Sequence, residues 1–262
     1  MSDEELPAAL RRDRISALTR ERGFVRVAEL SRIFRTSPVT IRSDLDHLES
    51  LDLVRRVHGG AVSTSGSSVN MDAPSIDPKA EAKASIGAVA ASLVTSGQTL
   101  VLGNGTTAQA VARALVRRDD LDSLTVITNG LQIALELQPA IPRITLIITG
   151  GTLRRDTPAL VDPLADIILR SISADVSIVG CKGLSIANGV SDDHIPGVAL
   201  NRRLLETGRR RVVVADSTKI GASSVARFWE AGDIDVLVTE SDSDRETLAE
   251  LREAGVKVET VH

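Results

Sequence analysis

The sequence is poor in the residues that build disulfide frameworks, aromatic binding platforms and membrane spans. It has one cysteine, no tyrosine, one tryptophan and three phenylalanines in 262 residues. A single cysteine excludes an internal disulfide and a cysteine-rich zinc site, and 2% aromatic content argues against base stacking on aromatic side chains. No apolar run reaches the roughly 18 residues of a membrane-spanning helix, and the charged N-terminus lacks the apolar core of a secretion signal. We therefore expect a cytoplasmic protein with no metal, no cofactor and no membrane partner.

What is present is typical of a globular chain with room for about two domains. Hydrophobic residues make up 42% of the chain and charged residues 25%, enough for a sizeable core. The net charge of −4 conceals a basic block, because residues 8–62 hold eleven arginines and seven acidic residues, a net +4. A basic block joined to an acidic remainder is typical of a DNA-reading head on a sensor domain.

Residues 36–61 predict a DNA-reading helix followed by a basic hairpin. Ser37 can cap the helix that Pro38 begins, and apolar residues at positions 41, 45 and 48 give this helix one inward face. The opposite face is polar apart from one valine, which in a major groove could contact a thymine methyl while an arginine forks onto guanine. The predicted DNA contacts are Ser37, Val39, Thr40, Arg42 and Ser43 on the helix, and Arg55, Arg56 and His58 on the hairpin.

Two further helices are expected before this one, over residues 11–22 and 25–34. A tight turn at 35–37 then gives the helix-turn-helix arrangement, to which the hairpin adds a wing. The alternative is a small three-helix bundle used for protein interaction, and the basic wing favours DNA. We expect a winged helix-turn-helix (α+β) domain over 8–62 and a serine- and proline-rich linker over 63–78.

After residue 79 the sequence alternates between strand-like and helix-like segments. Runs such as residues 144–148 and 212–215 are apolar throughout, as strands buried on both faces of a sheet must be. We expect residues 79–262 to form an open parallel α/β sheet covered on both faces. The predicted strands are Gln98–Leu102, Leu124–Thr128, Arg143–Thr149, Asp175–Gly180, Arg211–Ala215, Ile234–Thr239 and Val256–Val261. The predicted helices include Lys79–Val94, Ala108–Val116, Leu131–Leu137, Pro163–Ser171, Val198–Gly208, Ser223–Glu230 and Asp244–Ala254.

Glycines and small polar residues follow these strands at their carboxyl ends, where open parallel sheets bind ligands. The first strand runs into Gly-Asn-Gly-Thr-Thr at 103–107, a turn whose backbone amides can cradle a phosphate at the start of a helix. The lysine of a P-loop is missing, so nucleoside triphosphate hydrolysis is not expected. One such turn would be a routine connection, but several together favour a small phosphorylated polyol. The predicted ligand-binding residues are Gly103, Asn104, Gly105, Thr106, Thr107, Asn129, Gly150, Gly151, Lys182, Asp216 and Lys219.

Two other features have a structural interpretation. The acidic and histidine residues at 192–194 resemble a metal or acid–base cluster, but nearby glycine and proline predict a solvated loop. Cys181 ends an apolar run, so we expect a buried small hydrophobe instead of a reactive thiol.

The chain resembles the DeoR family of bacterial transcriptional regulators over nearly its whole length. In the head the resemblance is carried by Val-Ala-Glu-Leu-Ser at 27–31, by residues 40–49 and by Arg-Val-His-Gly-Gly-Ala at 56–61; beyond it, by residues 105–107, 126–129, 150–154 and 215–221. The resemblance implies an effector domain similar in fold to ribose-5-phosphate isomerase, which senses phosphorylated sugars or their catabolites. It also implies a homodimer or homotetramer that usually represses a sugar-utilisation operon and releases its double-stranded operator DNA when the effector binds.

The sequence departs from the family pattern at five positions. Ser43 stands where a second arginine is common, and Asp52 replaces a glycine before the wing. Gly103, Lys182 and Asn201 stand where an acid, an aspartate and a lysine are frequent. These three change the charge of the expected pocket, so we hypothesise an effector more acidic than a plain sugar monophosphate.

The alternative function is a sugar-phosphate isomerase that carries an accessory helical head. Aldose–ketose isomerisation needs a carboxylate base within reach of the substrate. Lys182 stands where that aspartate would be expected, and Gly103 opens the phosphate loop in place of an acid. We therefore predict no catalytic residues and a regulator that is not an enzyme.

Overall fold

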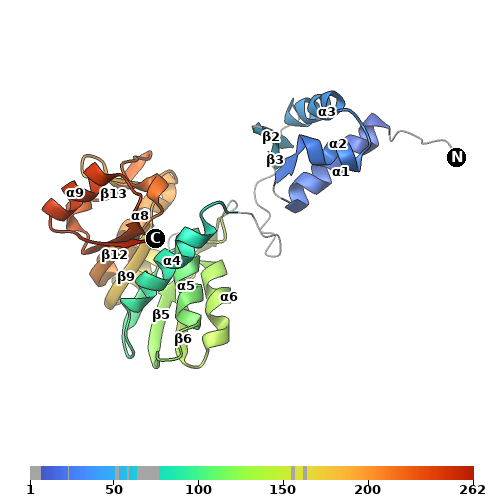
Figure 1. Cartoon of the computed structure of the whole chain (residues 1–262). Helices are drawn as coiled ribbons and strands as arrows, with labels where there is room; N and C mark the ends of the chain where they lie inside the picture. Colours follow the sequence, from blue (N-terminus) through green and yellow to red (C-terminus); the bar gives the residue numbers. More distant parts are fainter. Residues whose placement is uncertain are drawn as a thin grey trace. The chain divides into compact units, whose positions relative to one another are not determined.

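The structure is a computed structural model that describes residues 7–22, 24–50, 53–57, 59–63, 77–154, 157–161 and 164–262. The chain forms two compact units, one before Pro78 and one made of most of the chain after it (Figure 1). Each unit has hydrophobic cores of its own. Residues 64–76, most of the expected linker, lie outside the described residues.

The first unit is a winged helix-turn-helix, as expected. Its antiparallel sheet has the order β1-β3-β2, and its core gathers residues from all three helices and from the strands. The helix expected from Val25 begins only at Val27, because Val25 and Arg26 pair with Ala61 and Gly60 in a short strand. The elements are α1 (Ala8–Arg22), β1 (Phe24–Arg26), α2 (Val27–Ile33), α3 (Pro38–Ser50), β2 (Val54–Val57) and β3 (Gly60–Ser63).

A buried ion cluster ties α1 to α3 in this unit. The Arg11 Nε donates to Asp44 Oδ2 at 2.6 Å, and Arg12 Nε donates to Oδ1 at 2.8 Å. The side chains of Arg11 and Asp44 are only 8% and 2% exposed. Because a charge removed from water must be compensated, this cluster fixes how α3 is held against the first helix.

The second unit is built on a seven-stranded parallel sheet with the order β15-β14-β12-β9-β4-β5-β6. All seven strands expected from the sequence form this sheet. They are β4 (Thr99–Leu102), β5 (Leu124–Thr128), β6 (Ile144–Ile148), β9 (Ala174–Gly180), β12 (Gly208–Val214), β14 (Val236–Glu240) and β15 (Lys257–Val261).

Helices cover both faces of this sheet, each over its own hydrophobic core. One core contains residues of α4 (Ala80–Ser92), α5 (Thr106–Val116) and α6 (Leu131–Leu137), which lie on one side of the sheet in Figure 1. The other contains residues of α7 (Leu164–Arg170), α8 (Ile195–Thr207) and α9 (Arg245–Glu253). Short 3-10 turns occur at Gln138–Ala140, Ser217–Lys219 and Ala231–Asp233.

The helix expected over residues 223–230 is wrong. The segment contains strand β13 (Ala226–Trp229), which pairs with β11 (Gly189–Asp192), and β11 pairs with β10 (Gly183–Ser185). Phe228 is buried in the core while its neighbours are more exposed, the alternation of a strand. A second small hairpin, β7 (Thr152–Leu153) with β8 (Leu160–Val161), was also absent from the expected elements.

The expectation that residues 144–148 are buried on both faces is also wrong. Strand β6 is the last strand of the parallel sheet, and Ile147 and Ile148 are 40% and 43% exposed. An apolar run therefore predicted the strand correctly but not its place at the edge.

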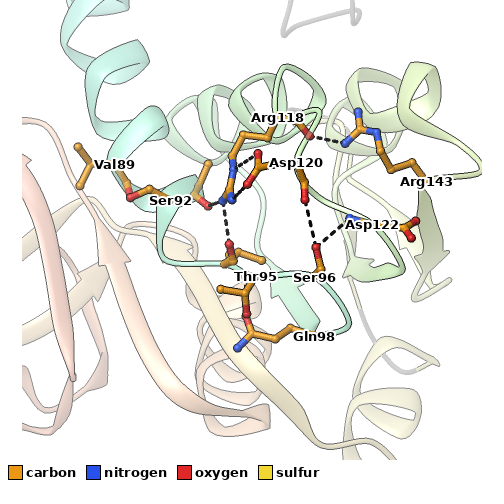
Figure 2. Close-up of polar contacts among 11 residues, drawn as sticks. Val89, Ser92, Thr95, Ser96, Gln98, Arg118, Asp120, Asp122 and Arg143 are labelled. Atoms are coloured by element: carbon orange, nitrogen blue, oxygen red, sulfur yellow. Dashed lines mark hydrogen bonds and ion pairs between the residues drawn. The ribbon is translucent and has the colours of Figure 1, made fainter.

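Two arginines cap the C-terminal ends of helices at the edge of the sheet where the strands begin. The Arg118 Nη1 donates to the carbonyl oxygens of Ala91 and Val94 at 2.6 and 2.8 Å, while Asp120 accepts from the same guanidinium (Figure 2). Arg143 donates to the carbonyl oxygens of Val116 and Arg118 at 2.9 and 2.7 Å. These bonds satisfy carbonyl groups at the C-terminal ends of α4 and α5. The hydrogen bond from Arg118 also lowers the pKa of Asp120.

Within the described part of the chain, none of the helices combines the length and the apolar character that a bilayer crossing demands. The same residues contain no group of three or more His, Cys, Asp or Glu side chains arranged to hold a metal ion.

We predict that Asp44→Asn destabilises the first unit by about 3–5 kcal/mol, because the buried Arg11 loses the carboxylate to which it donates. Hydrogen-exchange mass spectrometry of peptides from α1 and α3 measures this change within one unit of the full-length chain. Asp13→Asn is the matched control, since Asp13 is exposed on α1 and lies outside the cluster. Equal exchange rates in the two variants would contradict a structural role for the cluster.

Candidate functional site

The recognition helix α3 begins as the sequence predicts. The Ser37 Oγ accepts a hydrogen bond from the Thr40 backbone N–H at 3.1 Å, and Pro38 occupies the first helical position. Ile41, Leu45 and Leu48 are buried in the core, which confirms the inward face. The orientation of α3 is therefore set by apolar contacts on one side and by the Asp44 cluster.

The opposite face of α3 has the composition expected of a surface that enters a DNA groove. Val39 is 71% exposed, and Ser37, Arg42 and Ser43 are exposed beside it, with Thr40 half-buried. A valine this exposed among polar residues has no packing role in the unit. This exposed surface, which we call the N-terminal face of α3, remains the predicted base-contacting surface.

In the wing, Arg56 makes contacts with α3 that the sequence did not predict, and its predicted DNA contact stays a prediction. Its guanidinium is held by Asp46 and by the Arg42 carbonyl oxygen of α3, at 3.4 Å from the latter. The side chain of Arg55 and the whole of His58 lie outside the described residues, so their predicted DNA contacts stay predictions.

In the second unit, the chain reverses its direction across the sheet between β4 and β9. From β4 the chain proceeds to β5 and β6 on one side, and it then returns to β9 on the other side of β4. Ligands of open parallel sheets bind at such a reversal, outside the carboxyl ends of the strands. Gly103 and Gly180, which follow β4 and end β9, therefore mark the centre of the candidate site. We call the side of the sheet where its strands end the carboxyl edge.

The turn after β4, predicted to cradle a phosphate, leads directly into a helix start. Gly105 has φ +110°, a conformation that L side chains rarely adopt, and it precedes the eleven-residue helix α5 without a side-chain cap. Amide groups at this helix start therefore face the carboxyl edge with a positive dipole end. Asn104 and Thr106 are at least partly exposed here, whereas Thr107 is buried.

The turn after β12 adds charged groups next to β9. Asp216 is buried, and its carboxylate accepts from the Thr218 backbone N–H at 3.1 Å and lies 3.9 Å from the Lys83 Nζ. Lys219 belongs to the same turn. Burial, together with the negative charges of Asp192 and Asp216, raises the pKa of the nearby Cys181 thiol to about 12. Cys181 is only partly buried and packs against the hydrophobic core, so the expected packing role is confirmed but the expected full burial is not.

The residues predicted at the ends of β5 and β6 have structural roles of their own. The Asn129 Nδ2 donates to the Leu160 carbonyl oxygen at 3.0 Å, so the side chain holds the β7–β8 hairpin. A Cβ on Gly151 would lie 2.5 Å from the Val161 carbonyl oxygen, which explains this glycine by packing. Gly150 has φ +71° at the turn between β6 and β7. The buried Asn129 Oδ1 has no hydrogen-bond partner among the described residues, so one acceptor remains for a ligand hydroxyl or water.

The three positions at 192–194 are more ordered than the expected loop. Asp192 ends strand β11, and its carboxylate accepts from the His194 backbone N–H at 3.0 Å and from the Asn201 Nδ2 at 3.2 Å. Lys182 lies 4.0 Å from the exposed Asp193 carboxylate. Because Asp193 offsets its charge, Lys182 adds less positive charge to the site than its position in the sequence indicates.

The start of α4 also contributes to this region, which the sequence analysis missed. Lys79 Nζ donates to the Ser217 Oγ at 2.9 Å and to the Glu240 Oε1 at 2.8 Å, and the Ser217 backbone N–H donates to Glu240 Oε2 at 2.7 Å. Partial burial raises the pKa of Glu240, but the bonds from Lys79 and Ser217 outweigh it and hold this pKa below its usual value. The two partners of Lys79 lie 138 and 161 positions away in the sequence, so no local sequence pattern could have predicted these contacts.

Comparison with known proteins agrees with both units. The DeoR-like helix-turn-helix domain matches residues 11–66, and the DeoR C-terminal sensor domain matches residues 78–241. The regulator GolR of Listeria innocua is 34% identical over 250 residues, covering 95% of this chain and 96% of that protein. The glycerol-3-phosphate regulon repressor of Haemophilus influenzae is 32% identical over 234 residues, covering 88% and 89%.

Solved structures are more distant. Ribose 5-phosphate isomerase A of Methanocaldococcus jannaschii gives a TM-score of 0.39 at 17% identity, covering 56% of this chain and 55% of that chain. A transcriptional regulator of Streptococcus pneumoniae gives 0.36 at 11% identity, covering 69% and 88%. The two family matches span both units in order, and relatives above 30% identity span nearly the whole chain. This chain belongs to the DeoR family of transcriptional regulators.

Proposed function

We propose that this protein is a repressor of a sugar or carbohydrate catabolic operon, controlled by a small phosphorylated sugar or a related metabolite. The observation that carries the proposal is the Gly103–Thr107 turn, which opens on the start of α5 where the sheet reverses its direction. Backbone amides, a helix dipole and Lys219 on the neighbouring turn suit a phosphate dianion. Relatives named as the glycerol-3-phosphate regulon repressor support the same ligand class.

In this proposal the N-terminal face of α3 reads the operator. Arg42 and Val39 approach base edges, while Ser37, Thr40 and Ser43 support the contact with the backbone or the bases. Arg55 and His58 on the wing hold phosphates. Because helix-turn-helix proteins commonly bind paired half-sites about one DNA turn apart, we infer a homodimer or homotetramer.

The contacts of α4 support a route from ligand to DNA. This helix follows the linker in the sequence, and its first residues contact Asp216, Ser217 and Glu240. Farther along, Gly87 packs against α5, since a Cβ there would lie 2.5 Å from the Ala110 carbonyl carbon. A ligand bound between the start of α5 and the β12 turn would therefore lie next to both elements that α4 contacts. By linkage, effector and operator then weaken each other equally.

We predict that Arg42→Ala lowers affinity for the operator by about 1–3 kcal/mol and reduces discrimination against altered sites, because a base contact is lost. Fluorescence anisotropy on the intergenic DNA upstream of the gene, and on a scrambled duplex, measures both effects. Arg14→Ala is the control, since it removes the same charge from an exposed position of α1. Equal losses on the two duplexes for Arg42→Ala would rule out base reading by this residue.

We predict that a phosphorylated ligand binds at the carboxyl edge and that Lys219→Ala weakens it by about 1.5–3 kcal/mol, the value of a hydrogen bond to a charged group. Trp229 is the sole tryptophan and lies on β13, so its fluorescence reports titrations with ribose 5-phosphate, glycerol 3-phosphate and their unphosphorylated counterparts. Calorimetry provides the affinities independently of the fluorophore.

Lys257→Ala on the outermost strand β15 is the matched control. A compound that binds equally well without its phosphate, or one that is indifferent to Lys219, would contradict the phosphate site. If Lys182→Asp leaves affinity and preference unchanged, the more acidic effector is excluded.

We predict that Lys79→Met preserves ligand affinity but reduces the factor by which ligand weakens DNA binding. The substitution removes the hydrogen bonds from the start of α4 to Ser217 on the β12 turn and to Glu240 at the end of β14, while keeping an apolar side chain of similar length. The measurement is DNA affinity with and without saturating ligand, compared with Lys257→Met. An unchanged coupling factor would show that the signal does not pass through the start of α4.

A further inference from the structure

The alternation of strand β2 directs Arg56 toward the recognition helix. Side chains two residues apart share one face of a strand, and Val54 on this strand is fully buried in the core of the first unit. Arg56 shares the face of Val54 and is only 30% exposed in its side chain. Its guanidinium therefore points at α3, away from the outer face of the wing.

Three contacts join Arg56 to α3. The Nη1 donates to the Asp46 carboxylate and to the Arg42 carbonyl oxygen, and the Arg56 backbone N–H donates to Glu49 Oε1 at 2.6 Å. Positions 42, 46 and 49 follow one another at helical spacing, so they form a stripe along one side of α3. The Nε atom of Arg56 is buried as well.

The wing depends on these contacts because of its place in the sheet. Strand β2 is an edge strand that pairs only with β3, and Glu49 accepts the backbone N–H that Arg56 presents at that edge. A small hairpin gains little stability from its own pairing, so its position depends on what it is packed against. The clasp formed by Asp46, Glu49 and Arg56 provides that support.

We propose that Arg56 is a positioning residue that fixes the wing against the recognition helix, with Asp46 and Glu49 as its acceptors, and does not bind a DNA phosphate. The proposal rests on DNA binding by the head and not on the identity of any effector. The effect of the Asp46 charge on DNA affinity is then opposite to what simple repulsion by phosphates predicts. Asp46 is an acid on the DNA-reading helix, yet its carboxylate favours binding by holding the wing.

The competing explanation predicts the opposite effect of Asp46→Asn on DNA affinity. If Asp46 merely occupied Arg56 until a phosphate displaced it, then removing the Asp46 charge would release the arginine and strengthen DNA binding. Loss of Arg56 would also remove one phosphate contact, and each such contact contributes about 0.9 to the slope of log affinity against log salt.

The test uses the full-length protein with Arg56→Ala, Asp46→Asn and the control Asp13→Asn, which removes the same charge from an exposed position of α1. Binding to the upstream intergenic duplex and to a scrambled duplex is measured across a sodium chloride series, with no sugar phosphate present. Hydrogen exchange of β2 and β3 peptides is measured without DNA, with α1 and α2 peptides as the check on folding.

We expect Asp46→Asn to weaken binding to the upstream duplex several-fold, and Arg56→Ala to weaken it with an unchanged salt slope. Exchange in β2 and β3 should accelerate in both variants, while α1 and α2 keep their wild-type rates. Tighter binding by Asp46→Asn, a lower slope for Arg56→Ala, or unchanged exchange in the wing would each overturn the proposal. The exchange measurement needs neither DNA nor ligand. It therefore tests whether Asp46 and Arg56 hold the wing even if the proposed effector control fails.

Discussion

The parallel direction of the seven-stranded sheet is the constraint on which the proposed ligand-binding region depends. Parallel strands place all their carboxyl ends at one edge, so turns separated by a hundred residues meet there. The turn after β4 supplies amides, the turn after β12 supplies Asp216 and Lys219, and β9 lies between them. At the opposite edge, Arg118 and Arg143 donate to carbonyl oxygens at the ends of α4 and α5, and these contacts stabilise the fold.

A ligand can change DNA affinity only if it binds two arrangements of the protein with different affinity. In the proposal, the start of α4 provides this difference, because Lys79 bonds to Glu240 and to Ser217, which belongs to the turn beside Asp216. The pKa of Glu240 lies below its ordinary value, so its contribution is present at neutral pH and declines as pH falls through that lowered pKa. The contact is therefore intact under physiological conditions and available to be changed by a ligand.

Much of this architecture could be predicted from local pattern. Apolar runs identified all seven parallel strands, and the Ser37 cap with its apolar stripe identified α3. The errors arose where tertiary context decides. Residues 223–230 form a strand because β11 lies beside them, and β6 is exposed because no strand follows it in the sheet.

The same distinction applies to the site residues. Glycine turns at strand ends have a local signature, whereas the pairing of Lys79 with Glu240 spans 161 positions and has none. Arg56 is an intermediate case, because strand alternation from the core residue Val54 indicates its inward direction. The positive charge of the hairpin alone predicted that Arg56 contacts DNA.

The contacts of Arg56 also bear on how much positive charge the head presents. Among the arginines of residues 8–62 whose side chains the structure describes, carboxylates of α3 hold Arg11 and Arg12 (by Asp44) and Arg56 (by Asp46). Their charge is offset within the unit, so a count of arginines overstates the charge available for phosphates. In the proposed mode of binding, recognition relies on Arg42, on apolar contact by Val39 and on a firmly held wing more than on bulk positive charge.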